Sequence, residues 1–270
     1  MHLVSIGTTN ERSLHAALKS WYAEPGDRLE QPVDGFIVDI CRGELLIEIQ
    51  TRNLASIKRK LAALTARHPV RLVYPIPEEK WIVRLAPDGL TVLSRRKSPK
   101  RGRPIQLFEE LVSCPELAAH PNFSLEVLLT REAEIRREVP RLRRRRRGWL
   151  RYDRELLGVL ARLTFADPTD YHVFLPRRLP DPFTASDLAR ALNEPCYLAQ
   201  KVMYCLRRMG SVAVVGKKGN SLVYSVARPT PGCGQGVQDE KERSEKAVAV
   251  AGCHVSGARH APSARHLRRG

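Results

Sequence analysis

A run near the middle of the chain, Arg-Leu-Arg-Arg-Arg-Arg-Arg at residues 141–147, places six arginines in seven positions. Like charges at this density repel one another, and unpaired guanidinium groups do not enter a hydrophobic core. The run therefore predicts an exposed junction. It divides the chain into a first domain over residues 1–140, an arginine-rich linker over 141–148 and a second domain over 149–227.

The last part of the chain, residues 228–270, is rich in Gly, Ser, Ala, Arg and Glu and has almost no large apolar side chains. Such a segment buries too little surface to offset the entropy cost of ordering it, so we expect a disordered tail. It holds Cys253, His254, His260 and His266, but their spacing matches no familiar zinc pattern, so a metal site there is not favoured.

The chain is strongly basic, with 46 Lys and Arg against 29 Asp and Glu and a formal charge of +17. Basic side chains release counterions when they meet phosphates, so this excess favours a nucleic-acid partner, most simply DNA. A genome that prefers arginine codons is the alternative explanation. Short apolar runs, dispersed cysteines and a start without a signal-peptide pattern predict a cytoplasmic protein with no membrane-spanning helix.

The first domain alternates between helical and strand patterns. Apolar spacing predicts helices over residues 11–22, 54–67 and 104–113. Alternating or apolar runs predict strands over residues 33–40, 44–51, 70–74, 80–85, 90–93 and 123–130. The order α-β-β-α-β with additions predicts an α/β (α+β) fold, with a mixed sheet flanked by helices.

Two carboxylates, Asp39 and Glu48, lie on the first predicted hairpin. We expect this hairpin to pair Ile40 with Leu45. Asp39 then lies one diagonal step from Glu48, on the same face as Gln50. Two carboxylates with several waters are typical of an Mg²⁺ site, which also accepts a phosphate oxygen. An amphipathic hairpin with a solvated polar face is the alternative.

Asp39, followed after eight residues by Glu48-Ile49-Gln50 within the α-β-β-α-β order, resembles the PD-(D/E)XK nuclease superfamily. It looks most like the branch with E-x-Q, as in competence CoiA-like proteins. The resemblance covers roughly residues 11–76 and implies a restriction-endonuclease-like fold. It also implies that Asp39 and Glu48 hold Mg²⁺, which would lower the pKa of a water that attacks a phosphodiester. The Glu-Ile-Gln-Thr and Leu-Val-Tyr-Pro-Ile stretches are similar to those of an uncharacterised bacterial family, which implies no function.

Gln50 departs from the superfamily pattern, which usually has lysine at this position. An amide can orient water or phosphate by hydrogen bonds, but it supplies no positive charge to the transition state. Lys58 on the next predicted helix is the candidate replacement, with Lys60 close by, and ordinary surface lysines are the alternative. The candidate catalytic residues are therefore Asp39, Glu48, Gln50 and Lys58.

A basic segment follows the second predicted hairpin and has six cations among residues 94–103. Five of them are candidate nucleic-acid contacts: Arg95, Arg96, Lys97, Lys100 and Arg101. Because Pro and Gly shape this predicted loop, we expect it to grip a phosphate backbone. A flexible, solvated connection is the alternative.

The second domain resembles a winged helix-turn-helix. A capping box of Thr184 and Asp187 starts a short helix, and a longer helix is predicted from Pro195 to Met209. Strands over 212–215 and 221–226 flank a basic turn, and 152–163 is the expected first helix. The resemblance implies that the long helix approaches the major groove and the turn contacts phosphate. The residues concerned are Gln200, Lys201, Tyr204 and Arg208 on the helix and Lys217 and Lys218 in the turn.

These patterns leave three functions open. The first is a DNA-binding protein with an Mg²⁺-dependent phosphodiester-cleaving site, targeted by its winged helix. The second is a non-catalytic DNA-binding or transcriptional regulatory protein on an inactive nuclease scaffold, which Gln50 favours. The third is a docking subunit whose basic surfaces meet an acidic protein.

Overall fold

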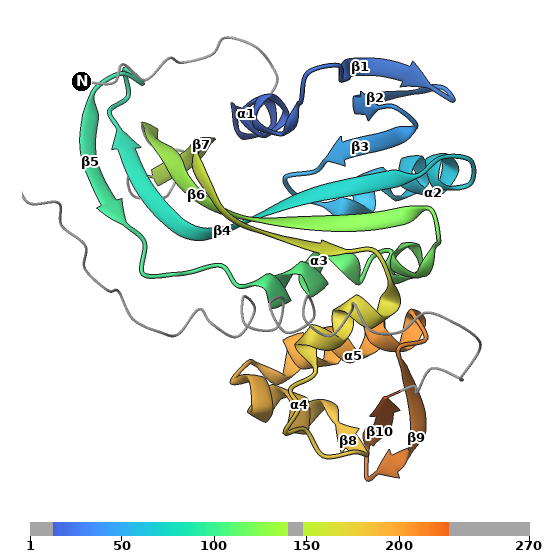
Figure 1. Cartoon of the computed structure of the whole chain (residues 1–270). Coiled ribbons are helices and arrows are strands. Elements are labelled where there is room, and N and C mark those ends of the chain that lie inside the picture. The colour runs from blue at the N-terminus through green and yellow to red at the C-terminus, as the bar shows by residue number, and fades with distance from the viewer. Residues whose placement is uncertain (1–12, 140–147, 227–270) are drawn as a thin grey trace, which may run out of the picture.

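The computed structural model describes residues 13–139 and 148–226 (Figure 1). A seven-stranded mixed sheet with helices packed on it lies above a three-stranded antiparallel sheet with its own helices. The expected α/β class and the mixed sheet flanked by helices are confirmed. The arginine run and the predicted disordered tail lie outside the described residues. No helix in the described ranges is long and apolar enough to cross a membrane.

The first half of the large sheet follows a helix–strand–strand–strand–helix–strand order. Its helices are α1 (Ser13–Tyr22) and α2 (Lys58–Thr65), and the 3₁₀ helix Leu54–Ile57 leads into α2. Its strands are β1 (Arg28–Val33), β2 (Phe36–Arg42), β3 (Leu45–Ile49) and β4 (Val70–Leu85).

The sequence pattern missed β1 because this strand lies at the edge of the sheet and is largely exposed, so it has no apolar alternation. The expected strand over residues 33–40 is wrong at its start. Asp34 and Gly35, both at positive φ (48° and 81°), form a tight turn that separates β1 from β2.

Three long strands, β4, β6 (Phe123–Val139) and β7 (Gly148–Phe165), dominate the rest of the sheet. The strand order is β1-β2-β3-β4-β6-β7, and β5 (Val92–Lys97) pairs with β4. The predicted strands over 70–74 and 80–85 are parts of one strand, irregular between Pro77 and Glu79.

The helix predicted over residues 152–163 is wrong, because these residues belong to β7 and pair with β6. Three register shifts along the β6–β7 ladder interrupt the alternation of side chains. The apolar residues of β7 therefore recur at irregular spacing that imitates a helix. The large sheet extends past the domain boundary that was expected at residue 148.

Helices cover both faces of the large sheet. Leu14 and Leu18 of α1 pack on Ile40, Ile47 and Ile49 on one face. On the other face lie α2 and a 3₁₀ helix, Pro104–Leu107, that continues into the short α3 (Phe108–Leu111). The helix predicted over 104–113 is thus mainly one 3₁₀ turn and one α turn.

The smaller unit consists of β8 (Phe183–Thr184), α4 (Ala185–Leu192), α5 (Cys196–Arg208), β9 (Val212–Lys218) and β10 (Ser221–Val226). The predicted capping box is confirmed, since the Thr184 side chain accepts a hydrogen bond from the Asp187 N–H. The strand order is β8-β10-β9. The 3₁₀ helix Pro168–Phe174 joins this unit to β7.

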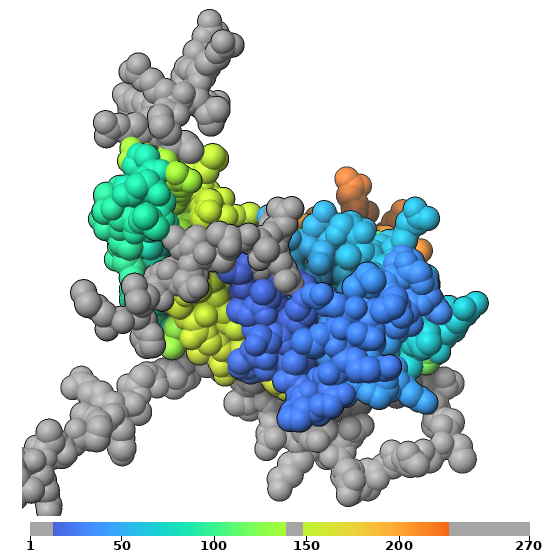
Figure 2. Space-filling model, turned by 90° about the horizontal axis from the view of Figure 1, so that it is seen from above, coloured from blue at the N-terminus to red at the C-terminus, as the bar shows by residue number. Residues whose placement is uncertain are grey.

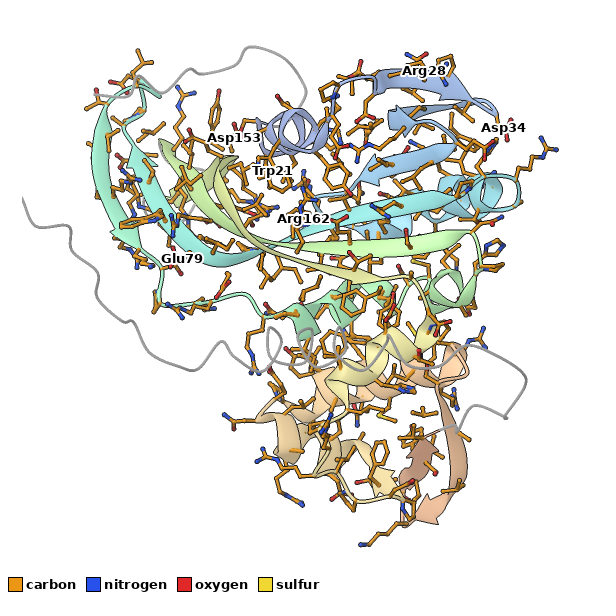
Figure 3. The ribbon with its side chains drawn as sticks, viewed as in Figure 1. Trp21, Arg28, Asp34, Glu79, Asp153 and Arg162 are labelled. Atoms are coloured by element: carbon orange, nitrogen blue, oxygen red, sulfur yellow. The ribbon has the colours of Figure 1, made fainter. Side chains whose placement is uncertain are left out.

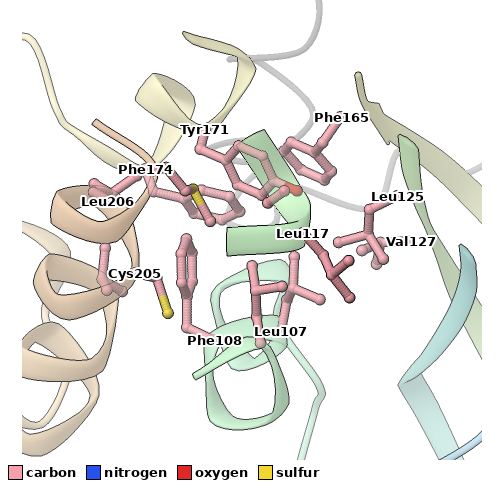
Figure 4. Packing of buried hydrophobic residues seen from close by; sticks show 14 of the residues in the cluster. Leu107, Phe108, Leu117, Leu125, Val127, Phe165, Tyr171, Phe174, Cys205 and Leu206 are labelled. Atoms are coloured by element: carbon pink, nitrogen blue, oxygen red, sulfur yellow. The ribbon is translucent and has the colours of Figure 1, made fainter. Parts of the chain in front are cut away.

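One continuous hydrophobic core joins the two units (Figure 4). Phe108 of α3 makes edge-on contacts with Tyr171 and Phe174, and Phe165 of β7 stacks on the same two rings. Leu206 of α5 is fully buried in this cluster. The smaller unit is therefore packed against the face of the large sheet that α2 and α3 cover, and is not joined to it by the chain alone.

Candidate functional site

The β2–β3 hairpin carries both predicted carboxylates. Its ladder places Ile40 opposite Ile47, two residues from the predicted pairing, because Gly43 at positive φ (58°) allows a shorter loop. A shift of two residues preserves the face on which each side chain lies. The paired part of the ladder ends at Ile40 and Ile47, however, just before Asp39 and Glu48. The Asp39 carboxylate is contacted from α1 and the Glu48 carboxylate from α2, on the opposite face, but the charge of Asp39 still acts on Glu48.

Asp39 lies where β2 separates from β3. Its Oδ2 accepts a hydrogen bond from the Ile49 N–H at 2.8 Å, and Nε2 of His15 on α1 lies 3.3 Å from the same oxygen. Burial raises the pKa of Asp39, but the interactions with His15 and Ile49 outweigh it and hold this pKa below its usual value. Asp39 is therefore ionised at neutral pH.

Glu48 is nearly buried, with a side chain 6% exposed. Burial, and after it the charge of Asp39, raises the pKa of Glu48 to about 7 despite the nearby ammonium of Lys60. Lys60 Nζ lies 2.6 Å from Glu48 Oε1 and donates to the Ile37 carbonyl at 2.5 Å. Glu48 Oε1 has no hydrogen bond of good geometry, so the Lys60 ammonium stabilises it through its charge rather than through a well-directed hydrogen bond.

The donor set fits a divalent cation. Two neighbouring carboxylates repel each other, and Glu48 Oε1 is buried without a well-directed hydrogen bond, so a cation between the acids would relieve both costs. Within residues 13–139 and 148–226, no group of three or more His, Cys, Asp or Glu is arranged to hold a metal. An ion here would rely on Asp39, Glu48 and water, which is how Mg²⁺ is commonly bound.

Gln50 and Lys58, the other two predicted catalytic residues, are not directed at the carboxylates. The Gln50 amide nitrogen donates to the Asn53 carbonyl (3.1 Å) and to Ser56 Oγ (3.2 Å), which fixes the segment leading into α2. Lys58 is exposed, and its charge acts on Cys114 and Glu116.

Lys60 supplies the cation of this site. Residues two positions apart in an α-helix lie about 200° apart around its axis, so Lys58 and Lys60 cannot face the same group. His15 was not predicted at all. It precedes Asp39 by 24 residues, and only the packing of α1 on the sheet brings the two together. No local sequence signal could have found it.

The raised pKa of Glu48 predicts stability that falls as the pH rises. Folding favours the protonated form, so the contribution of Glu48 is complete below its usual pKa of 4.5 and is lost as the pH passes about 7. Without divalent cations, the free energy of unfolding of the wild type relative to Glu48→Gln should fall by on the order of 1–3 kcal/mol between pH 5 and 8. Urea unfolding of both proteins in EDTA measures this. A difference that stays constant or grows would contradict it.

The predicted basic loop is partly a strand. Arg95, Arg96 and Lys97 lie on β5, which is exposed along its length, and Lys100 and Arg101 follow it. Seen from above, β5 (teal) stands on one side of the molecule and α1 with β1–β3 (blue) on the other, with β6 and β7 between them (Figure 2).

Some of these basic residues are engaged within the sheet. The Arg95 guanidinium lies over the Trp81 ring, 5.0 Å from its centroid, and Lys97 Nζ lies 2.9 Å from Glu79. Arg96, Lys100 and Arg101 form no ion pair with any residue in the described ranges. These three are the residues of the segment best placed to meet phosphate.

Some of the predicted nucleic-acid contacts of the smaller unit are exposed, and one is engaged within the protein. On α5, Gln200 and Tyr204 are exposed and Lys201 is half-buried. Arg208 instead binds Glu116 of the 3₁₀ helix Pro115–Ala119 and so joins the two units. Lys217 and Lys218 are exposed at the end of β9, just before the turn in which they were expected.

Comparisons with known proteins identify relatives but no activity. A family model described as a domain of unknown function, DUF8091, matches residues 12–166, from the start of α1 to the end of β7. An uncharacterised protein from Treponema pallidum (strain Nichols) is 30% identical over 228 residues, which cover 84% of this chain and 89% of that protein. No solved structure matches the chain.

Proposed function

Because the chain belongs to the DUF8091 family of unknown function, we propose its activity from its own residues: Mg²⁺-dependent cleavage of nucleic-acid phosphodiesters. The observation that carries this proposal is the meeting of Asp39, Glu48 and the Lys60 ammonium where β2 separates from β3. The order α1-β1-β2-β3-α2-β4 around them supports the resemblance to PD-(D/E)XK nucleases and a restriction-endonuclease-like core.

Each residue of the site has a distinct role in this proposal. Asp39 and Glu48 would hold Mg²⁺, which when bound supplies a water of lowered pKa for attack on phosphorus. His15 and the Ile49 N–H fix the Asp39 carboxylate and keep it ionised. The Lys60 ammonium stabilises the negative charge that develops on the phosphate in the transition state, the role usually given to lysine in E-x-K sites.

Basic surfaces would hold the substrate. Arg96, Lys100 and Arg101 beside β5 and Lys217 and Lys218 on the smaller unit are exposed cations that suit a phosphate backbone. The β8-β10-β9 sheet with α4 and α5 supports a winged helix-turn-helix that targets the nuclease to DNA. Binding should weaken steeply with salt, since each phosphate contact releases counterions.

Cleavage of duplex, single-stranded and branched DNA in Mg²⁺, with EDTA as the control, tests the proposal. We expect Asp39→Asn to lower the cleavage rate by at least about 100-fold, since metal ions contribute several kcal/mol to phosphoryl transfer. DNA binding measured in Ca²⁺ should be unchanged. If none of the three substrates is cleaved by the wild type in Mg²⁺ or Mn²⁺, the nuclease proposal is wrong.

One observation favours a second candidate, a non-catalytic DNA-binding or regulatory protein. Lys60 balances the charge of Glu48 without a metal, and Gln50 is directed into the loop before α2. This candidate predicts salt-dependent DNA binding, no cleavage, and an affinity unaffected by Asp39→Asn. Weaker binding in Lys217→Ala would support a role for the smaller unit in both candidates.

A further inference from the structure

A small pocket lies between α1, the segment after β3 and the first half of β7. Its volume is about 90 Å³, and its polar lining includes Thr51, Arg52, Arg151, Asp153 and Arg154. Figure 3 shows Asp153 on β7 beside α1.

Two lining residues connect the pocket to Asp39. Leu14, which also lines the pocket, directly precedes the His15 that contacts Asp39. Thr51 lies two residues beyond Ile49, whose N–H binds the same carboxylate. The pocket and the contacts of the Asp39 carboxylate therefore share α1 and the end of β3.

Arg154 forms a fixed wall of the pocket. Its guanidinium donates two hydrogen bonds to the buried Glu132 (2.9 and 3.1 Å) and one to the Thr51 carbonyl (3.1 Å). The Ser13 hydroxyl donates to the Arg154 carbonyl at 2.5 Å, which ties α1 to β7. Because three contacts orient this guanidinium, its remaining N–H donors have a fixed direction.

The other two arginines give the pocket its positive charge. Arg52 is half-buried and Arg151 is exposed, and within the described part of the chain neither forms an ion pair. Asp153 is the one carboxylate in the lining, and its Oδ1 accepts from the Arg154 backbone N–H at 2.7 Å. Since Glu132 balances Arg154, the pocket keeps an excess of one positive charge.

Size and chemistry together select the ligand. Sites for cofactors and drug-sized molecules measure about 300–1,000 Å³. A pocket of about 90 Å³ is far smaller but accommodates a single small oxyanion. The planar fork of an arginine matches the oxygens of a phosphate, and three arginines line this pocket.

We propose that this pocket binds one phosphate group of the nucleic-acid strand and thereby places a neighbouring phosphodiester at Asp39 and Glu48. The identity of the strand as substrate rests on the proposed function. Phosphate binding itself rests only on the pocket. The phosphate is either the terminal group of a strand or an internal one, and the two sources have the same chemistry.

The test compares the double variant Arg52→Gln/Arg151→Gln with a matched control, Arg59→Gln/Arg67→Gln. The control removes two exposed arginines on and just after α2, so it has the same net charge. Binding of a single-stranded oligonucleotide, with and without a 5′-phosphate, is measured in Ca²⁺ over a range of salt. Thermal unfolding of both variants establishes that they are folded.

We expect the pocket variant to bind at least about 10-fold more weakly, and its salt slope to fall by about 0.7, the value for one neutralised phosphate on a single strand. The control should stay within about twofold of the wild type. A loss confined to the 5′-phosphorylated strand identifies a terminal phosphate, and an equal loss for both strands identifies an internal one. A folded pocket variant that binds both strands like the control overturns the inference.

This readout is separate from cleavage. Protein that binds through Arg52 and Arg151 but never cleaves would refute the nuclease proposal and keep the phosphate pocket. If the protein cleaves DNA but binds it equally well without these two arginines, the nuclease proposal stands and the phosphate pocket is refuted.

Discussion

Lys60→Ala is expected to slow Mg²⁺-dependent DNA cleavage by about 10²–10³-fold, the usual cost of removing one group that stabilises transition-state charge. Lys58→Ala, in the same helix, should stay within about twofold of the wild type. The difference follows from position, since Lys60 Nζ lies 2.6 Å from Glu48 Oε1 while Lys58 is exposed on another side of α2. Single-turnover cleavage at saturating enzyme measures the chemical step.

Two controls separate catalysis from folding in this experiment. Lys60→Arg keeps the positive charge and should recover part of the rate. Thermal unfolding should show that both alanine variants are folded at the assay temperature, with Lys60→Ala the less stable because it leaves the buried Glu48 without its partner. DNA binding in Ca²⁺ should be similar for the two. Equal rates for Lys58→Ala and Lys60→Ala would show that the Lys60 ammonium does not act in the reaction.

Arg154→Ala is expected to destabilise the fold by about 3–5 kcal/mol, because it leaves a buried charge without its partner. Glu132 has a side chain only 1% exposed, and Arg154 is its bidentate partner between β6 and β7. The same change also frees the Thr51 carbonyl. Urea unfolding followed by circular dichroism gives the free energy directly.

The double variant Glu132→Gln/Arg154→Gln tests whether the unpaired charge causes this loss. It should be more stable than Arg154→Ala, because no carboxylate remains buried alone, and the difference should be at least about 1 kcal/mol. A loss below about 1 kcal/mol in Arg154→Ala itself would show that water or another cation compensates Glu132.

Features specified by neighbouring residues could be predicted from the sequence. The capping box at Thr184, the buried stripe of α5 and the β2–β3 hairpin each depend on a few adjacent residues, and each is present. The mixed sheet also followed from the order of elements. The predicted location of Asp39 and Glu48 on one hairpin also followed from adjacent residues, but the contacts of their carboxylates with α1 and α2, on opposite faces of the sheet, did not.

Features specified by distant contacts could not be predicted. The sequence of β7 resembled a helix because irregular pairing with β6 disturbs the alternation of apolar and polar side chains. β1 has too few buried residues to show such an alternation. The roles of Lys60 and His15 depend on how α2 and α1 pack on opposite faces of the sheet. Spacing along the chain pointed to Gln50 and Lys58 instead.

The claim that Asp39 and Glu48 form a divalent-cation site can be tested directly by calorimetric titration with Mg²⁺, supported by Mn²⁺ binding followed by electron paramagnetic resonance. We predict one ion per wild-type chain, loss of that binding in Asp39→Asn and in Glu48→Gln, and retention in Gln50→Ala, whose side chain faces the loop before α2. Absence of binding to the wild type, or equal binding by the wild type and both carboxylate variants, would contradict the metal site.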